Sequence, residues 1–313
     1  MNAPLAHPNW QEILDAICED IGPFLNRGKV ADYIPALAEV DPGAFAIAFA
    51  GIDGTEASAG LSDTPFSIQS ISKVFALCLA LELEGESLWG RVGREPSGTA
   101  FNSIVQLEQE RGKPRNPFIN AGALVVTDSI VGHCGERSGI ARLLSFIRRC
   151  ARTPEIHINP VVADSEAAFG DRNRSLAYFM KSFGVLRQDV PTVLDTYFNQ
   201  CAIEMSVSDL ARAGLFLAAN GTSPVINEWI TNPDRVERVN AIMMLCGHYD
   251  MSGDFAFRVG LPGKSGVGGG ILAIIPNVGT VAVWSPGLNT AGNSLAGTVA
   301  LEWFSHRAGI NLF

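Results

Sequence analysis

The sequence predicts an α+β fold: an antiparallel β-sheet flanked by helices, with an inserted helical subdomain. Two hairpin patterns near the ends of the chain support this prediction. The apolar run at residues 44–54 ends in a turn signal and is followed by a second short strand near Ala57. Near the C-terminus, residues 271–275 and 280–284 are β-rich runs joined by a Pro-Asn-Val-Gly turn.

Helical periodicity fills the region between the two hairpins and adds one helix at each end of the chain. The predicted helices cover residues 10–25, 70–84, 121–134, 140–150, 207–219, 235–247 and 291–306. Strands at both ends with helices between them argue against an alternating, doubly wound sheet. We expect one catalytic domain over residues 1–313, with its helical subdomain at roughly 70–250.

The charge distribution argues against a nucleic-acid or membrane partner. The 313-residue chain has a formal net charge of -9 and no block of lysine and arginine. No apolar run reaches the roughly 18 residues of a membrane span, and the N-terminus lacks the basic start and apolar stretch of a signal peptide. We therefore expect a cytoplasmic protein whose partner is a small molecule.

The cysteines and histidines do not form a metal-binding pattern. The six cysteines include no CxxC pair, and the five histidines are isolated and include no HExxH. In the expected compartment the cysteines are reduced thiols. We expect no metal and no cofactor.

The stretch "FSIQSISKVFALCLA" places Ser70 and Lys73 three residues apart at the start of an apolar helix. Residues at i and i+3 share a helix face, so the amine can approach the hydroxyl. Burial lowers the pKa of a lysine, and a neutral amine can take the proton that activates a serine nucleophile. The alternative is an ordinary helix start, with Ser70 or Ser72 as the cap and Lys73 in solvent.

Two further segments match the companions that such a motif has in serine-lysine enzymes. Lys264-Ser265-Gly266 stands directly before an apolar strand, and Tyr197-Phe198-Asn199 offers Asn199 for the slot of an SDN element. The glycine run from Gly266 to Gly270 is either a flexible turn or a place where the backbone approaches a ligand closely. It is not a phosphate loop.

Several long motifs together resemble the serine-dependent glutaminase family, over about residues 25–305. They are "GKVADYIPALAEV", "GREPSGTAFNS", "NPFINAGALVV", "SEAAFGDRNRSLAYFM", "YDMSGDFAFRVGLPGKSGVGGGI" and "WSPGLNTAGNSLAG". The resemblance implies the β-lactamase and penicillin-binding-protein type of fold. It also implies hydrolysis of the side-chain amide of L-glutamine to L-glutamate and ammonia without a cofactor, and a homodimer or homotetramer.

The resemblance also assigns roles to individual residues. Ser70 would be the nucleophile, Lys73 its activating partner and Tyr249 the tyrosine beside the serine, while the backbone at Ser70 and Val267 would form the oxyanion hole. The residues that would line the glutamine pocket are Tyr33, Gln69, Asn120, Glu166, Asn173 and Tyr197.

These roles suit glutamine chemically, because the substrate carries an ammonium, a carboxylate and a primary amide. Glu166 would pair with the ammonium, and the amide and hydroxyl side chains would hold the other groups. Each residue also has a structural alternative: Asn120 as a helix cap, Glu166 as an acid in the first turn of a helix and Tyr197 as a core residue.

Three departures and two rival functions stay open at this stage. The third motif is KSG where β-lactamases often have KTG, no family motif precedes about Gly22, and the extra flanking regions of larger family members are absent. A β-lactamase, esterase or peptidase would use the same serine-lysine chemistry. A non-catalytic amino-acid-binding relative would be expected to lose Ser70 or Lys73, and the sequence keeps both.

Overall fold

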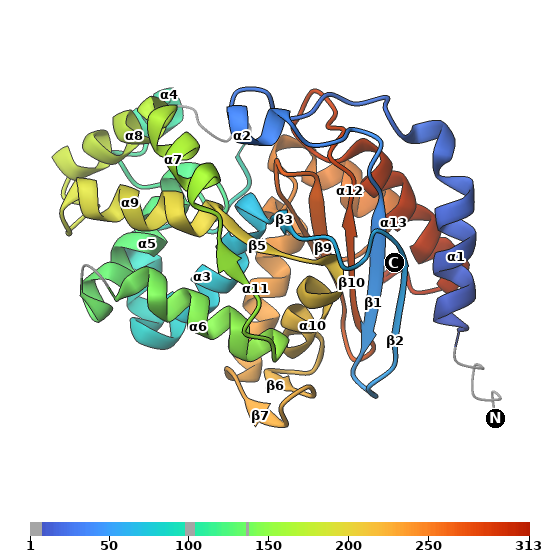
Figure 1. Cartoon of the computed structure of the whole chain (residues 1–313). Helices are drawn as coiled ribbons and strands as arrows, with labels where there is room; N and C mark the ends of the chain where they lie inside the picture. The colour runs from blue at the N-terminus through green and yellow to red at the C-terminus, as the bar shows by residue number, and fades with distance from the viewer. Residues whose placement is uncertain (1–7, 98–103, 136–137) are drawn as a thin grey trace.

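A five-stranded antiparallel sheet runs through one half of the molecule (Figure 1). The computed structural model describes residues 8–97, 104–135 and 138–313. In spatial order the strands are β2 (Glu56–Gly60), β1 (Ala46–Gly51), β10 (Gly279–Trp284), β9 (Gly270–Ile275) and β8 (Gly263–Ser265). The N-terminal hairpin thus pairs with the C-terminal one, and the register places Ala48 opposite Ala282.

Alternation along β1 gives the sheet two different faces. Ile47 and Phe49 belong to the core beneath α1 (Trp10–Asp20) and α13 (Leu295–Ala308), where Trp10 stacks on Phe49 with ring centroids 3.9 Å apart. The intervening Ala48 and Ala50 belong to the larger core on the other face. Small side chains on that face let α10 (Val207–Ala218) pack closely, so the sheet is covered by helices on both sides.

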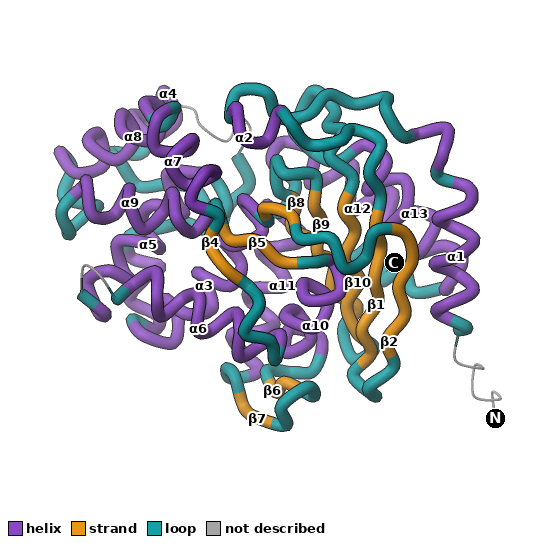
Figure 2. The backbone as a smooth tube through the Cα atoms, viewed as in Figure 1, coloured by secondary structure: helices purple, strands orange, loops and turns teal. Residues whose placement is uncertain are grey.

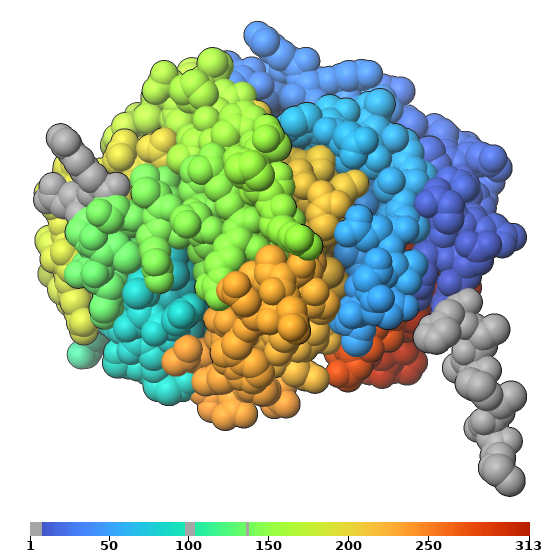
Figure 3. Space-filling view, turned by 60° about the horizontal axis from the view of Figure 1, so that its bottom comes forward, coloured from blue at the N-terminus to red at the C-terminus, as the bar shows by residue number. Residues whose placement is uncertain are grey.

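The segment between β2 and β8 forms the helical part, most of which lies beside the sheet in Figure 2, and in Figure 3 its green and yellow surface adjoins the blue surface of the N-terminal segments. Its other helices are α3 (Ser72–Leu83), α4 (Ile104–Gln109), α5 (Asn120–Cys134), α6 (Gly139–Ala151), α7 (Pro160–Ala168), α8 (Asp171–Ser182), α9 (Val190–Cys201), α11 (Pro233–Cys246) and α12 (Ser252–Val259). Its short strands are β3 (Phe66–Ser67), β4 (His157–Ile158), β5 (Ile203–Met205), β6 (Thr222–Ser223) and β7 (Glu228–Trp229). A short helix, α2 (Pro35–Ala38), precedes β1.

Both predicted hairpins are present, and the predicted helix ends differ where local capping decides them. The first helix stops at Asp20, because Gly22 and Pro23 follow and form a separate 3-10 turn. The last helix begins at Leu295 instead of residue 291, since the Ser294 hydroxyl accepts a hydrogen bond from the Gly297 amide and caps it.

The sequence did not predict α2, α4, α7, α8, α9 and α12, nor the short strands β3 to β8. Helix α8 is rich in polar residues and buries only Leu176, Ala177 and Met180, so its apolar periodicity is weak. Among the helices that the structure describes, none has both the length and the apolar character needed to cross a bilayer.

Helix α3 is enclosed on every side. All residues from Ser72 to Leu81 are buried, and the helix packs against α5, α6 and α11. Lys73 is therefore drawn into the interior with its helix, and only 1% of it is exposed. The alternative of a solvated lysine at an ordinary helix start is wrong.

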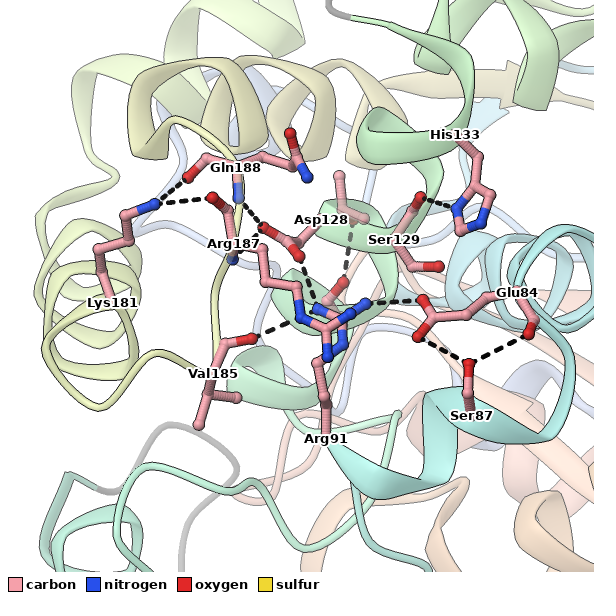
Figure 4. Close-up of polar contacts among 12 residues, drawn as sticks. Glu84, Ser87, Arg91, Asp128, Ser129, His133, Lys181, Val185, Arg187 and Gln188 are labelled. Carbon is pink, nitrogen blue, oxygen red and sulfur yellow. Dashed lines mark hydrogen bonds and ion pairs between the residues drawn. The ribbon is translucent and has the colours of Figure 1, made fainter.

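A buried ion triad fastens α3 to α5 (Figure 4). The Arg91 guanidinium donates to the Glu84 carboxylate at the end of α3, at 2.7 Å, and to Asp128 in α5, at 2.6 Å. The other Asp128 oxygen accepts from the backbone amides of Arg187 and Gln188 at 2.8 and 2.7 Å. Because α3 carries Lys73 and α5 begins at Asn120, the triad fixes two predicted site residues relative to one another.

Replacing Arg91 by Met is expected to lower the free energy of unfolding by about 3–5 kcal/mol, because two buried carboxylates lose their counter-charge. Urea denaturation measures the loss. Arg149→Met is the matched control: its pair with Glu228 is 47% and 54% exposed, so less than about 1 kcal/mol should be lost. Equal effects of the two substitutions would contradict a stabilising role for the triad.

Candidate functional site

Ser70 lies at a sharp bend between β3 and α3. Gln69 adopts a left-handed backbone conformation with φ of 50°, and a 3-10 turn over Gln69–Ile71 leads into the helix. Two hydrogen bonds at Ser67 hold the bend in place. The Ser67 hydroxyl donates to the Cys201 carbonyl at 2.9 Å and accepts from the side-chain amide nitrogen of Gln69 at 3.1 Å. Ser70 is nearly buried, 8% exposed, and faces a cavity.

Tyr249 reaches Ser70 from a second strained turn. Its φ of 56° is unusual for a bulky aromatic residue. Burial raises the pKa of the Tyr249 hydroxyl to about 12, while hydrogen bonds with the Ser70 and Ser265 side chains act in the opposite direction. The phenol is therefore neutral at pH 7 and lies beside the predicted nucleophile.

The Lys73 amine is held by two acceptors. It donates to the Asn120 side-chain oxygen at 2.7 Å and to the Phe118 carbonyl at 3.2 Å. Burial lowers its pKa from the ordinary value of 10.5 to about 8. A neutral amine has two N–H groups, and these two acceptors use both, which leaves its lone pair for a proton.

The cavity in front of Ser70 measures about 350 Å³. It is lined by Tyr33, Ile34, Gln69, Ser70, Asn120, Glu166, Phe169, Arg172, Asn173, Tyr197, Cys201 and Val267. Eight of the ten predicted site residues are in this lining. The other two, Lys73 and Tyr249, are buried next to it, where they contact Asn120 and Ser70 respectively.

Amide side chains continue the polar wall from Lys73. The Asn120 oxygen also accepts from the Tyr197 hydroxyl at 3.3 Å, and its nitrogen donates to Asn173 at 3.0 Å. Ile119 occupies the N-cap position of α5, so Asn120 is not the helix cap that the alternative predicted. Tyr197 is fully buried as a core residue would be, yet its hydroxyl edges the cavity.

Glu166 contributes the carboxylate of the cavity. It is 8% exposed and lies near the C-terminal end of α7, not in a first turn as the alternative assumed, so the helix dipole does not favour its charge. Burial raises the pKa of the Glu166 carboxyl to about 7. A hydrogen bond with Gln69 and the charge of the nearby Lys73 act in the opposite direction but are smaller effects. A cationic partner in the cavity would favour the ionised form.

The glycine run brings Val267 to the bend at Ser70. A Cβ atom on Gly266 would lie 2.5 Å from the Ile68 carbonyl oxygen, and one on Gly268 would lie 2.3 Å from that of Ser67. The close approach predicted for this run is therefore first of all to the chain's own backbone, and it sets the Val267 segment against the segment that carries Ser70.

The segment offered for the SDN slot reaches the cavity through one residue, and the motif lysine Lys264 has a contact that was not predicted. Tyr197 lines the cavity, whereas Asn199 is not part of the lining and donates to the Asp195 carbonyl one turn earlier, at 2.9 Å. Lys264 is fully buried, and its amine donates to the carbonyls of Gly247 and Ser265 while lying 4.8 Å from the Tyr249 ring. The KSG motif marked Lys264, but its contact with Tyr249 could not be read from spacing.

Four lining residues had no sequence signal of their own: Ile34, Phe169, Arg172 and Cys201. Each stands next to or within a quoted motif, but none is of a type that indicates chemistry by itself. All six cysteines are free thiols in the structure. Within the described ranges, no three His, Cys, Asp or Glu side chains gather as a metal site would require.

Comparison with known proteins decides the family. The glutaminase family model matches residues 28–313. This chain belongs to the glutaminase family. A glutaminase of Rhizobium rhizogenes is 57% identical over 303 residues, which are 97% of this chain and 98% of that protein. A glutaminase of Rhizobium meliloti is 53% identical over 100% of this chain and 99% of its own length.

Solved structures of glutaminases share the whole fold. A probable glutaminase named ybaS superposes with a TM-score of 0.94 at 38% identity, covering 99% of both chains. A probable glutaminase from Bacillus subtilis, complexed with 6-diazo-5-oxo-L-norleucine, gives a TM-score of 0.88 at 32% identity, again over 99% of both chains. The predicted α+β, β-lactamase-like fold is confirmed.

Lys73→Met is expected to stabilise the protein at pH 7 by about 2–3 kcal/mol, since lowering the pKa from 10.5 to about 8 corresponds to about 3 kcal/mol. Between these values the unfolded lysine holds a proton that the folded one has released, so the stability of the parent protein rises with pH and the advantage of the variant disappears near pH 10.5.

Urea denaturation of the Lys73→Met variant at pH 7 and pH 10 checks this dependence. Lys29→Met, at a side chain that is 77% exposed, is the control and should change little at either pH. A Lys73→Met variant with the same stability difference from the parent protein at both values would contradict the low pKa.

Proposed function

We propose that the chain hydrolyses the side-chain amide of L-glutamine to L-glutamate and ammonia through an acyl-enzyme on Ser70. The observation that carries the proposal is the placement of Ser70, Glu166 and the amide side chains of Asn120 and Asn173 around one small cavity. Family membership supports the coarse activity. The relative from Bacillus subtilis was solved with an analogue whose name specifies an α-amino acid with a carbonyl at carbon 5, the position of the glutamine amide.

Each of the two α-groups of glutamine has a complementary group in the cavity. The Glu166 carboxylate pairs with the α-ammonium, and the pairing lowers the carboxyl pKa from about 7 so that the ion forms on binding. Asn120, Asn173 and the hydroxyls of Tyr33 and Tyr197 donate to the α-carboxylate, and Gln69 lies beside them. Both α-groups of the substrate are then held before the amide reacts.

Ser70 attacks the amide carbon, and its proton passes to the neutral Lys73 amine. In the structure that amine donates to Asn120, and substrate contact with Asn120 would loosen this bond and free the amine to turn toward Ser70. The negative charge that develops on the amide oxygen is held by the backbone N–H groups of Ser70 and Val267.

The leaving group departs as ammonia after it receives one proton, which Lys73 supplies through the Tyr249 hydroxyl beside Ser70. Water then attacks the γ-glutamyl ester and gives up its proton to Lys73 by the reverse route. The carboxylic acid product forms as the Ser70–acyl bond breaks, and Ser70 recovers its proton. No metal or organic cofactor takes part in this scheme.

The length of the substrate side chain sets the selectivity between glutamine and asparagine. With both α-groups held, the amide carbon must reach the Ser70 oxygen, and asparagine is one methylene too short. We expect strong preference for L-glutamine over L-asparagine. The β-lactamase and esterase rival uses the same dyad and can also hold a glutamate in its pocket, so Glu166 does not separate the two functions, and the family match is what favours the glutaminase.

We further propose a cytoplasmic homodimer or homotetramer acting as a single catalytic domain over residues 1–313. Six free thiols are consistent with a reducing compartment. Sedimentation of the purified chain would give the assembly state.

Ser70→Ala is expected to lose essentially all glutamine turnover while keeping the fold, because no other nucleophile in the scheme replaces the hydroxyl. Lys73→Ala should lower kcat by about 10²–10⁴-fold, the effect of removing a general base. Ammonia release is the measurement, and Asn199→Ala, on the same helix as Tyr197 but turned away, is the control that should stay active. Substantial turnover by Ser70→Ala would rule out the acyl-enzyme.

Glu166→Gln keeps the shape of the side chain and removes the charge that pairs with the substrate ammonium. We expect kcat/KM for L-glutamine to fall by a factor that corresponds to a loss of roughly 2–4 kcal/mol in transition-state stabilisation. The loss should be far smaller for glutaramic acid, which has no α-amino group. Asp164→Asn, an exposed acid on the same helix, is the control. Equal losses for both substrates would mean that Glu166 serves the chemical step or the fold instead of binding.

A further inference from the structure

A second cavity, larger than the substrate cavity, lies on the outer side of the segments that carry the site. Its volume is about 630 Å³, against about 350 Å³ for the cavity at Ser70. Helices α2 and α7, which contact each other, form two of its walls, and the rest comes from β3 and the residues before it, from Glu204 of β5, from Gly268 and from Trp284 at the end of β10. We call it the α2–α7 groove. The two cavities have no lining residue in common.

The walls of the α2–α7 groove are apolar. Leu37, Phe66 and Trp284 lie in its lining, and the Phe66 and Trp284 rings are stacked with centroids 5.3 Å apart. Val161 adds a side chain that is 66% exposed, on the first turn of α7. Leu37, Phe66 and Trp284 are only 4–6% exposed. An aromatic or branched apolar body placed here would therefore cover mainly the exposed Val161 and Pro35.

The charges of the groove have one sign. Glu39 and Glu204 line it, and no lysine, arginine or histidine is part of the lining. One Glu204 oxygen accepts from the Asn159 side chain at 2.9 Å, and the other lies 3.4 Å from the His157 ring nitrogen. A carboxylate offers about four acceptor positions, so Glu204 can also receive a bond from a ligand. The Ser165 hydroxyl in the same wall is buried and has no hydrogen-bond partner in the described structure.

We infer that the α2–α7 groove binds a small organic cation, a primary ammonium that carries an aromatic-sized apolar body. The ammonium would lie between the Glu39 and Glu204 carboxylates, and the apolar body against Trp284 and Val161. An anion of the same shape would meet two carboxylates and is excluded by charge.

Such a ligand would influence the substrate cavity, because the groove and the cavity share supports. Ser67, in the groove, accepts the hydrogen bond from Gln69, in the cavity. The Trp284 indole donates to the Gly268 carbonyl, one residue after Val267, at 3.0 Å. Leu37 and Val162 of the groove belong to the same buried cluster as Tyr249 and Val267. Occupation of the groove should therefore change the affinity of the cavity for an amino-acid ligand.

Calorimetric titration of the full chain with phenethylammonium tests the binding. We expect saturable binding of one equivalent, with no binding of 3-phenylpropionate, which has the opposite charge, and none of methylammonium, which lacks the apolar body. Absence of phenethylammonium binding, or equal binding of 3-phenylpropionate, would overturn the inference.

Variants locate the bound probe. Glu204→Gln, which can keep the bond from Asn159, should weaken phenethylammonium binding about fivefold, as expected for a partly exposed charge pair. Val161→Lys, at an exposed position, should weaken it at least tenfold by placing a like charge in the groove. Glu166→Gln should leave it unchanged. Loss of binding in Glu166→Gln with none in Glu204→Gln would place the probe in the substrate cavity and overturn the inference.

The influence on the cavity rests on the proposed function and is measured without turnover. The dissociation constant of L-glutamate is determined with and without saturating phenethylammonium, and we expect at least a threefold change that is lost in Val161→Lys. Unchanged glutamate affinity, with probe binding intact, would overturn the coupling. Failure of glutamate to bind at all would count against the proposed function. Binding of a cation in the α2–α7 groove would then be judged from the phenethylammonium titration alone.

Discussion

The site depends on the burial of α3 within apolar surroundings. A helix that is covered on all sides cannot place a lysine at its start without removing that lysine from water, and Lys73 is 1% exposed. The low dielectric lowers the amine pKa from its ordinary value of 10.5 to about 8, which brings the neutral form much closer to physiological pH. The Arg91 triad then holds α5 at α3, so that Asn120 and Phe118 receive the amine.

Two strained backbone positions adjoin Ser70. Of the eight described non-glycine residues with positive φ, four are asparagines, which adopt this conformation readily, and Arg111 and Arg152 follow the ends of α4 and α6. The remaining two, Gln69 and Tyr249, both adjoin Ser70, one in sequence and one by its side chain. Such conformations persist only where surrounding contacts enforce them, here Ser67 below Gln69 and Ser265 beside Tyr249.

The parts of the fold and site that could be predicted are those with a local signal. Alternation and turn residues revealed both hairpins, and the quoted motifs gave eight lining residues of the cavity. Helix α8 and strand β8 were missed, one because it is polar and the other because three residues carry no period. The bond from Lys73 to Asn120 spans 47 residues and arises from packing of α3 on α5, which no spacing rule contains.

Two buried lysines in one site influence one another's protonation. Lys264 is fully buried, and its pKa is lowered by burial first and then by the charge of Lys73. Phe118 contacts both lysines. Its carbonyl accepts a hydrogen bond from the Lys73 amine, and the centre of its ring lies 5.8 Å from the Lys264 amine nitrogen. Because a proton on either amine disfavours a second proton on the other, the protonation states of Lys73 and Lys264 are coupled. The two lysines differ in their surroundings. Lys264 donates to two backbone carbonyls, whereas Lys73 donates to Asn120, which lines the cavity.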